Sequence, residues 1–132
     1  MLALTGATGF IGNALLNRLT TTGYRVRALY RPRAGRSQPG LPGVEWISGD
    51  LQDAGALEAL VTGTQAVIHC AGSVRGITQA DFDSVNVDGA MRVAQATARQ
   101  IQAPRFLLIS SLAARSPQLS HYAGSKWRGE CA

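Results

Sequence analysis

Thr5-Gly6-Ala7-Thr8-Gly9-Phe10-Ile11-Gly12 is the stretch of sequence that decides the fold of this chain. It begins at the end of a short apolar run, Leu2–Thr5, which is typical of a buried strand. It leads into the segment Phe10–Thr22, in which apolar residues recur at the spacing of a helical face, and Gly23 follows as a helix-ending residue. A strand that turns through glycines into a helix predicts the first unit of a parallel sheet.

The three glycines of this stretch have separate expected roles. Gly6 permits a tight turn, Gly9 lets the backbone approach a phosphate, and Gly12 lets the helix pack closely on the sheet. The amides at the start of the helix then point at an anion, which the helix dipole also favours. The stretch lacks the Gly-Lys-Ser/Thr of a nucleoside-triphosphate loop, so it predicts a dinucleotide pyrophosphate site. The predicted contacts are Gly6, Thr8, Gly9, Phe10, Ile11 and Gly12.

Strand patterns and helix patterns alternate along the chain, except that a surface loop rich in Pro, Gly, Arg and Ser, 31–43, joins the second and third strands. Strands are predicted at 2–5, 24–30, 44–48, 66–70 and 105–110, and helices at 10–22, 53–62, 81–102 and 121–132. This alternation predicts one α/β domain over residues 1–132, a Rossmann-like doubly wound parallel sheet of strand order 3-2-1-4-5 between two helical layers. The apolar run 106–109 predicts a fifth strand buried on both faces. Because a full dinucleotide fold carries further strands, we expect a piece of a longer protein that lacks the substrate-binding part.

The composition is that of an ordinary globular protein. Apolar residues make up 45% and charged residues 16% of the chain, and no apolar run approaches the ~18 residues of a membrane helix. The start, Met1–Leu4, has no basic flank, which argues against a secretory signal. Cys70 and Cys131 are expected to be free thiols in a reducing compartment. We therefore expect a cytoplasmic protein without a membrane partner.

Arginines stand at the end of the second predicted strand, where the chain reads Tyr30-Arg31-Pro32-Arg33. An acidic residue at this place would bind the ribose 2′-hydroxyl of NAD and repel the 2′-phosphate of NADP. Arginine instead suits bidentate binding of phosphate. We predict NADP as the cofactor, with Arg31 the first and Arg33 the second candidate for the 2′-phosphate, and NAD as the second choice. The alternative is a solvated arginine loop.

Six short blocks occur in the order that is found in a known superfamily. They are Thr5-Gly6-x-x-Gly9-x-x-Gly12, Gly49-Asp50-Leu51-x-Asp53, His69-Cys70-Ala71-Gly72, Asn86-Val87-x-Gly89, Ser110-Ser111 and Tyr122-x-x-x-Lys126. On these blocks the sequence resembles the short-chain dehydrogenase/reductase superfamily, in its extended, NAD-dependent epimerase/dehydratase-like branch. The resemblance covers essentially the whole chain and implies an NAD(P)-binding domain of an oxidoreductase or epimerase.

The resemblance implies a catalytic pair, Tyr122 and Lys126. Residues four apart share one face of a helix. A free tyrosine is a poor base at neutral pH, and a neighbouring ammonium favours its phenolate. Tyr122 would exchange the proton of a hydroxyl or carbonyl, and Lys126 would also hold the nicotinamide-ribose hydroxyls. Ser111 would bind the substrate oxygen, with Ser110 nearer the cofactor.

The remaining blocks imply contacts with the cofactor. Asp50 would accept a hydrogen bond from the adenine amino group, with Leu51 packed on the ring. Ala71 and Gly72 would leave room for the ribose and nicotinamide. Asn86 resembles the family's structural asparagine. His69 and His121 have no ligand-spaced partners, so no metal site is expected.

The sequence therefore predicts hydride transfer between a nicotinamide and a carbon bearing oxygen in a small-molecule substrate. Both a reductase and a sugar-nucleotide epimerase fit, and the arginines favour the reductase. A non-catalytic NADP-binding sensor or structural module is the main alternative. A nucleic-acid-binding protein rests only on the net charge of +5, and the basic residues do not gather beyond the cofactor loop. A homodimer is left open.

Overall fold

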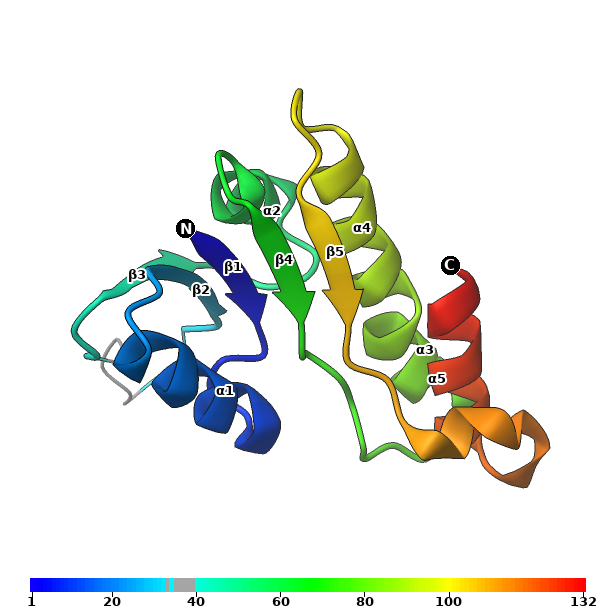
Figure 1. Ribbon diagram of the computed structural model, residues 1–132. Coiled ribbons are helices and arrows are strands. Elements are labelled where there is room, and N and C mark those ends of the chain that lie inside the picture. Colours follow the sequence, from blue (N-terminus) through cyan, green and yellow to red (C-terminus); the bar gives the residue numbers. More distant parts are fainter. Residues whose placement is uncertain (33, 35–39) are drawn as a thin grey trace.

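The computed structural model describes residues 1–32, 34 and 40–132, so Arg33 lies outside the described residues. The strands and helices follow one another in the predicted order, except that two helices occupy the region of the single predicted helix 81–102 (Figure 1). In chain order they are β1 (Leu2–Thr5), α1 (Phe10–Thr21), β2 (Val26–Tyr30), β3 (Val44–Ser48), α2 (Ala54–Val61), β4 (Ala66–His69), α3 (Gln79–Asn86), α4 (Asp88–Ala98), β5 (Arg105–Leu108), the 3₁₀ turns η1 (Leu112–Arg115) and η2 (Pro117–Leu119), and α5 (His121–Cys131).

Within the described ranges the strands form one parallel sheet of order β3-β2-β1-β4-β5. This confirms the predicted Rossmann-like topology. Thr5 at the end of β1 lies beside His69 at the end of β4, and His69 lies beside Leu108 of β5. The loops that follow these strands therefore meet at one edge, below the arrowheads in Figure 1. In a doubly wound sheet this carboxyl edge is where ligands bind.

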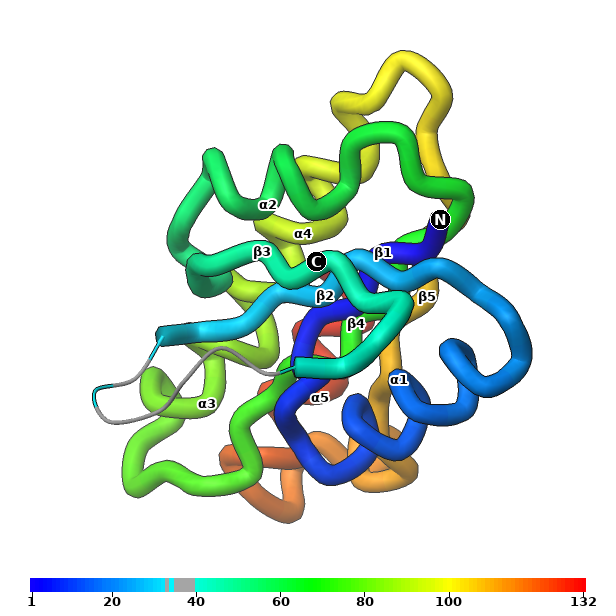
Figure 2. The backbone as a smooth tube through the Cα atoms, turned by 90° about the vertical axis from the view of Figure 1, so that its left-hand side faces the viewer, coloured from blue at the N-terminus to red at the C-terminus, as the bar shows by residue number. Residues whose placement is uncertain are grey.

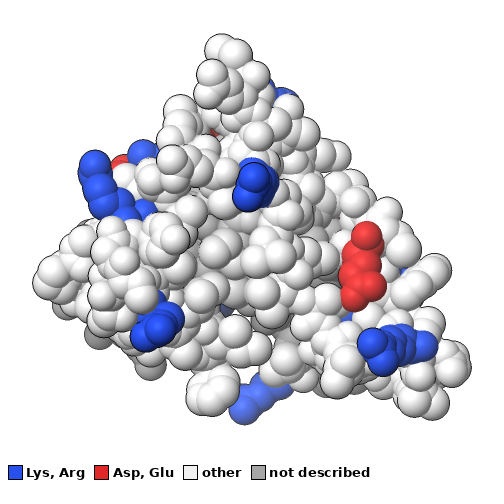
Figure 3. Space-filling model, in the orientation of Figure 1, with Lys and Arg blue, Asp and Glu red and all other residues white. Residues whose placement is uncertain are grey.

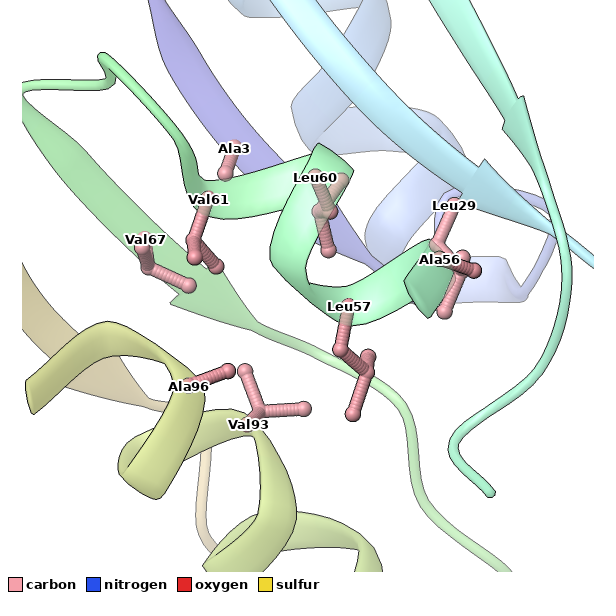
Figure 4. Close-up of a cluster of buried hydrophobic side chains, with 9 residues drawn as sticks. All are labelled: Ala3, Leu29, Ala56, Leu57, Leu60, Val61, Val67, Val93 and Ala96. Carbon is pink, nitrogen blue, oxygen red and sulfur yellow. The ribbon is translucent and has the colours of Figure 1, made fainter. Parts of the chain in front are cut away.

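Helices cover both faces of the sheet, which confirms the predicted three layers. α2 and α4 lie on one side of the strands and α1 on the other (Figure 2). The apolar side chains between α2, α4 and the sheet form one core cluster, drawn in Figure 4, with members Ala3, Leu29, Ala56, Leu57, Leu60, Val61, Val67, Val93 and Ala96. A second cluster under α1 consists of Leu4, Ala7, Leu16, Val26, Ala28 and Ile68.

The predicted helix 81–102 is wrong in its continuity and bounds. The chain forms α3 and then α4, and Val87 between them has φ −105° and ψ −67°. α3 begins at Gln79 because Thr78 and Asp81 form a capping box there. The break directs Asn86 at the end of α3 toward the chain after β4, where its side chain bonds Ser73. The apolar spacing continues through the break and so does not reveal it.

The predicted burial of the fifth strand on both faces is also wrong. β5 is the edge strand of the sheet, and Phe106 and Leu107 are 37% and 53% exposed. α4 contacts β5 on one face only, and α1 lies over the other half of the sheet. β4 and β5 also end earlier than predicted, at His69 and Leu108, so Ser110 and Ser111 lie in the loop after the strand.

Leu60 provides a test of the core between α2 and the sheet, because its side chain is fully buried. We expect Leu60→Ala to lower the free energy of unfolding by about 2–5 kcal/mol through lost burial and a residual cavity. Leu119→Ala is the matched control, since Leu119 is 77% exposed, and it should change stability by less than about 0.5 kcal/mol. Urea unfolding followed by circular dichroism measures both. Equal losses in the two variants would contradict this packing.

Candidate active site

A cleft of about 410 Å³ opens at the carboxyl edge of the sheet. The walls come from the ends of β1, β2, β3 and β4 and from α3, elements that are distant in sequence. Of the residues predicted to bind the cofactor, those in the walls are Gly6, Thr8, Gly9, Arg31, Asp50, Leu51, Ala71 and Gly72. The structure therefore brings four of the predicted sequence blocks or segments to one cavity.

The turn after β1 packs directly on the backbone that follows β4. Gly6 has φ +70°, and a Cβ on it would lie 2.5 Å from the amide nitrogen of Ala71. A Cβ on Gly12 would collide with the carbonyl of Gly6, so the first turn of α1 also lies directly on the loop. These two positions therefore require glycine, one for its backbone conformation and both for space. At Gly9 a Cβ would meet the Gly6 carbonyl oxygen at 3.2 Å, a less severe contact.

The N-terminus of α1 is open to a ligand. Gly9 is its N-cap, and among the described residues no side chain caps the helix and no acidic residue lies in its first turn. Phe10 and Ile11, whose amides belong to this turn, are 96% and 57% exposed. Free amides and the positive end of the helix dipole favour an anion at this place. The geometry suits the pyrophosphate predicted from the sequence.

Arg31 and Asp50 lie in the same cleft wall. Arg31 is exposed, and within the described part of the chain no carboxylate forms an ion pair with it. One oxygen of Asp50 accepts a hydrogen bond from the amide of Gln52 at 2.8 Å. Asp53, not Asp50, caps α2 by accepting from Ala56. Asp50 thus keeps its second oxygen for a partner, while its turn fixes its position.

Leu51 packs between the cleft and α4. A Cβ on Gly89 would lie 2.7 Å from the Cδ1 atom of Leu51, so Gly89 makes room for this side chain. Leu51 also contacts the core cluster under α2. Its position is thus set by the core, and its exposed part forms an apolar piece of the cleft wall.

α5 carries Tyr122 and Lys126. Lys126 is only 6% exposed, and its ammonium donates a hydrogen bond to the carbonyl of Ile109, just after β5, at 2.9 Å. Burial lowers the pKa of Lys126, and the nearby carboxylate of Glu130 acts in the opposite direction. The ring of Tyr122 is half-buried and meets Phe82 of α3 edge to face, with ring centres 6.2 Å apart.

Asn86 holds α5 in place from the end of α3. Its side-chain amide donates to the carbonyl of Ser73 and to the hydroxyl of Ser125, at 2.9 and 2.8 Å. The carbonyl of Asn86 faces Gly129, where a Cβ would collide with it. A short ion pair between Arg128 and Asp83, 2.7 Å, adds a third link between α3 and α5. Asn86 thus links α3 to the loop after β4 and to α5.

Ser110 and Ser111 line a second hollow of about 520 Å³. The hydroxyl of Ser110 donates to the carboxylate of Glu130. Ser111 caps η1, and its hydroxyl oxygen accepts from the amide of Ala113 at 3.2 Å, which leaves the hydroxyl proton for a ligand. The other residues of this hollow are Leu112, Ala114, Arg115, Pro117, Trp127 and Glu130.

The cleft and the second hollow are distinct, and the described walls of both exclude Tyr122 and Lys126. Phe10, Ile11 and Gly12 also lie outside the cleft wall. Lys126 nevertheless affects residues at both the cleft and the second hollow. It bonds the carbonyl of Ile109 beside Ser110, and its charge opposes the burial that raises the pKa of the Cys70 thiol in the cleft wall.

His69, at the end of β4, is a fully buried residue of this region. Its Nδ1 lies 2.7 Å from the hydroxyl of Thr5, which accepts from the amide of Ala71 at 3.3 Å. Burial, and then the charge of Lys126, lowers the pKa of His69 to about 4. The imidazole is therefore neutral at neutral pH and holds the ends of β1 and β4 together.

Sequence reasoning missed several residues of the cleft wall. They are Leu29, Gly49, Gln52, Cys70, Ser73, Ser84 and Val85. Gly49 and Cys70 lie inside two of the six sequence blocks. Their neighbours in those blocks are predicted cofactor contacts, and this is a signal that could have found them. Ser84 and Val85 belong to α3, which ends before Val87, and the apolar spacing of the sequence does not reveal that break.

Four further features concern metal ligands, cysteines, membrane helices and surface charge. In the described ranges, no three His, Cys, Asp or Glu side chains gather as a metal site would need. Cys70 and Cys131 are free thiols. Among the described residues, no helix combines the length and apolar character needed to cross a bilayer. On the face drawn in Figure 3 the described Lys and Arg side chains stand apart rather than in one patch.

Comparison with known proteins identifies the family. A sequence model of the NAD dependent epimerase/dehydratase family matches residues 2–123. The chain belongs to this family. Its membership confirms the resemblance to the extended short-chain dehydrogenases/reductases that the sequence blocks indicated.

Individual proteins are similar to this chain in sequence or in fold. The chain is 44% identical to the ceramide reductase of Caulobacter vibrioides over 135 residues, which cover 98% of this chain and 40% of that protein. A short-chain dehydrogenase/reductase superfamily protein from Agrobacterium tumefaciens, solved with bound NAD, aligns with a TM-score of 0.80 at 26% identity, covering 98% of this chain and 43% of that one. Uronate dehydrogenase from the same species aligns with a TM-score of 0.74 at 26% identity, with 98% and 53% covered. The chain thus spans about two fifths to half of the length of these relatives.

The neutral state of His69 predicts a pH dependence of stability. The unfolded chain takes up a proton on this histidine below its ordinary pKa of 6.5, whereas the folded protein does so only near 4. The contribution of His69 is therefore complete above pH 6.5 and is lost as the pH falls toward 4, by about 3 kcal/mol. We expect His69→Gln to remove this part of the acid destabilisation, as measured by denaturant unfolding at a series of pH values.

His121→Gln is the matched control for His69→Gln. His121 is exposed at the start of α5, and its removal should leave the acid destabilisation of the wild type in place. If both variants keep the full pH dependence, the buried imidazole is not its source.

Proposed function

We propose that the protein containing this chain is an NADP(H)-dependent reductase that interconverts a ketone and a secondary alcohol. The observation that carries the proposal is the placement of Lys126. It is a buried ammonium on the helix that bears Tyr122, and it is bonded to the chain just after β5 and acts electrostatically on the cleft wall. The bonded partner of the buried Lys126 ammonium is a carbonyl group and not a carboxylate. A structural ion pair therefore does not account for its burial.

The residues divide the chemistry in the following way. A bound nicotinamide supplies or accepts the hydride. Tyr122 gives its hydroxyl proton to the carbonyl oxygen as that oxygen becomes a hydroxyl, and takes it back in the reverse reaction. Lys126 favours the phenolate that remains, and Ser111 donates a hydrogen bond to the reacting oxygen.

The cleft walls support the mode of cofactor binding. The pyrophosphate would lie on the open N-terminus of α1, against Gly9, Phe10 and Ile11. Asp50 and Leu51 would hold the adenine, and Ala71 and Gly72 would face the ribose and nicotinamide. Arg31, exposed in the cleft wall, would bind the 2′-phosphate of NADP, with Arg33 as the second candidate.

We further propose that the substrate is a long-chain, apolar ketone rather than a sugar nucleotide. The relative at 44% identity is a ceramide reductase, so a lipid substrate has a precedent in a similar protein. Large apolar side chains also stand exposed around the carboxyl edge, with Val74 at 72%, Ile77 at 89% and Leu112 at 78%. Exposed apolar surface of this kind at a site favours a ligand that buries it.

Tyr122→Phe tests the chemistry. It removes only the exchanging hydroxyl, so we expect kcat for reduction of a long-chain ketone to fall by about 10²–10⁴-fold. The dissociation constant for NADPH should stay within about twofold, because the ring and Lys126 remain. Loss of NADPH absorbance and NADPH fluorescence titration measure the two quantities in the full-length protein.

Tyr24→Phe is the matched control for Tyr122→Phe, since Tyr24 is exposed between α1 and β2, away from the carboxyl edge. It should leave kcat unchanged. Tight NADPH binding with no turnover of any ketone, in the wild type and in both variants, would instead support a sensor.

Arg31→Ala tests the choice of cofactor. Loss of a charge-assisted bond to phosphate is worth about 1.5–3 kcal/mol, so NADPH binding should weaken by about tenfold or more. NADH binding should stay nearly constant because NADH lacks the 2′-phosphate. Arg25→Ala, an exposed arginine at the other end of β2, is the control for loss of charge and should affect neither cofactor. Equal weakening of NADH and NADPH would overturn the role of Arg31.

A further inference from the structure

Two residues of α5, one helical turn apart, hold two consecutive residues of the chain after β5. Lys126 donates to the carbonyl of Ile109 at 2.9 Å, and Glu130 accepts from the hydroxyl of Ser110. Since residues at positions i and i+4 lie on one face of a helix, both bonds come from the same face of α5. Ser111, proposed above to bind the substrate oxygen, follows directly in the chain.

The bond between Ser110 and Glu130 has no explanation in cofactor binding. Ser110 lines the second hollow and not the cleft. Glu130 is exposed overall, yet its carboxylate points at this serine and lines the same hollow. An exposed glutamate that only served solubility would not need to bond a serine 20 positions away in the chain.

We propose that Glu130 is a positioning residue that holds the Ser110–Ser111 segment against the helix of Tyr122 and Lys126. The inference rests on the proposed reductase function. The bond fixes the distance between the end of β5 and α5, and so fixes Ser111 relative to the two catalytic residues of that helix. Small errors in such a distance cost much of the rate, because the reacting groups must stay in contact.

The charge of Glu130 has a second consequence for Lys126. The charges that bear on Lys126 are those of Glu130 from α5 and Cys70 just after β4, and the charge of Lys126 in turn bears on His69 at the end of β4. At neutral pH His69 is neutral, since its pKa is about 4, and the Cys70 thiol is neutral, since burial raises its pKa. Glu130 is therefore the charged member of this set.

Charged residues on neighbouring elements have other partners or places. On α3, which also packs on α5, Asp83 is paired with Arg128. Arg115 of η1 lines the hollow with Glu130.

The sign of the charge effect follows from these contacts. The carboxylate of Glu130 raises the pKa of Lys126, which burial lowers. Without the carboxylate, Lys126 loses its proton at a lower pH. Because the proposed reaction needs the ammonium, the basic limb of the pH profile of kcat should move to lower pH in Glu130→Gln.

The experiment compares Glu130→Gln, Glu130→Ala, Ser110→Ala and the double variant Ser110→Ala/Glu130→Ala in the full-length protein. The amide of glutamine can still accept from Ser110, so Glu130→Gln should keep kcat at its optimum within about threefold and shift the basic limb to lower pH. Glu130→Ala should lower kcat by about tenfold with KM for NADPH unchanged, and the double variant should be no worse, because the two residues share one interaction.

Glu58→Gln is the matched control. Glu58 is an exposed glutamate of α2 whose carboxylate accepts from Gln100 at 2.5 Å, and no residue of α2 lines the hollow of Ser110 and Ser111. It should leave kcat and the pH profile unchanged. Melting temperatures of all variants show whether a loss of rate only follows a loss of folded protein.

Each outcome decides the inference. Additive losses in the double variant, an unshifted pH profile in Glu130→Gln, or losses that only track the melting temperature would overturn the positioning role. If Tyr122→Phe is inactive while the Glu130 variants match the wild type, only this inference fails. If Tyr122→Phe is fully active, the proposed function itself fails, whatever the Glu130 variants do.

Discussion

The contact between the turn after β1 and the backbone after β4 is the constraint on which the site depends. It exists because Gly6 has no side chain, so that the amide of Ala71 can approach where a Cβ would stand. The same turn presses on the first turn of α1 through Gly12. A side chain at Gly6 would collide with the backbone after β4, and one at Gly12 would collide with the turn after β1.

A buried network of hydrogen bonds makes this contact more rigid. Thr5 links the imidazole of His69 to the amide of Ala71, so the ends of two neighbouring strands and the start of the next loop move as one. A buried imidazole can do this at low cost only while neutral, and burial keeps it so. The N-terminus of α1 and the loop that starts with Ala71 are therefore held at a fixed separation, which a ligand spanning both would need.

Much of this could be predicted from the sequence, because the signals are local. The apolar spacing and the glycines at the turns locate the strands and helices, and Asp53 caps α2 from its place before an apolar helical face. The six blocks named residues that the fold then gathers at one edge. Elements with local causes, such as the turn at Gly6, were predicted best.

The rest depends on contacts between distant segments, which a single sequence does not reveal. The break at Val87 separates α3 from α4 directly after Asn86. The side chain of Asn86 bonds Ser73 and Ser125, which lie 13 and 39 positions away in the sequence. The exposure of Leu107 follows from the edge position of β5 and from the reach of α1, not from its own apolar run. Glu130 looks like an ordinary helical surface residue until Ser110 is found beside it.

The two hollows lie at different parts of the carboxyl edge of the sheet. The cleft collects the ends of β1 to β4, with the features that suit a dinucleotide, whereas the second hollow collects the loop after β5 and the outer face of α5. Lys126 is the residue that connects them, because it bonds the chain beside Ser110 and its charge acts on Cys70 in the cleft wall. In the proposed reaction the cofactor would lie in the cleft and the substrate in the second hollow, so the proton-handling groups would lie at this boundary. The buried position of Lys126 would then serve that reaction, with α5 held from both α3 and the chain after β5.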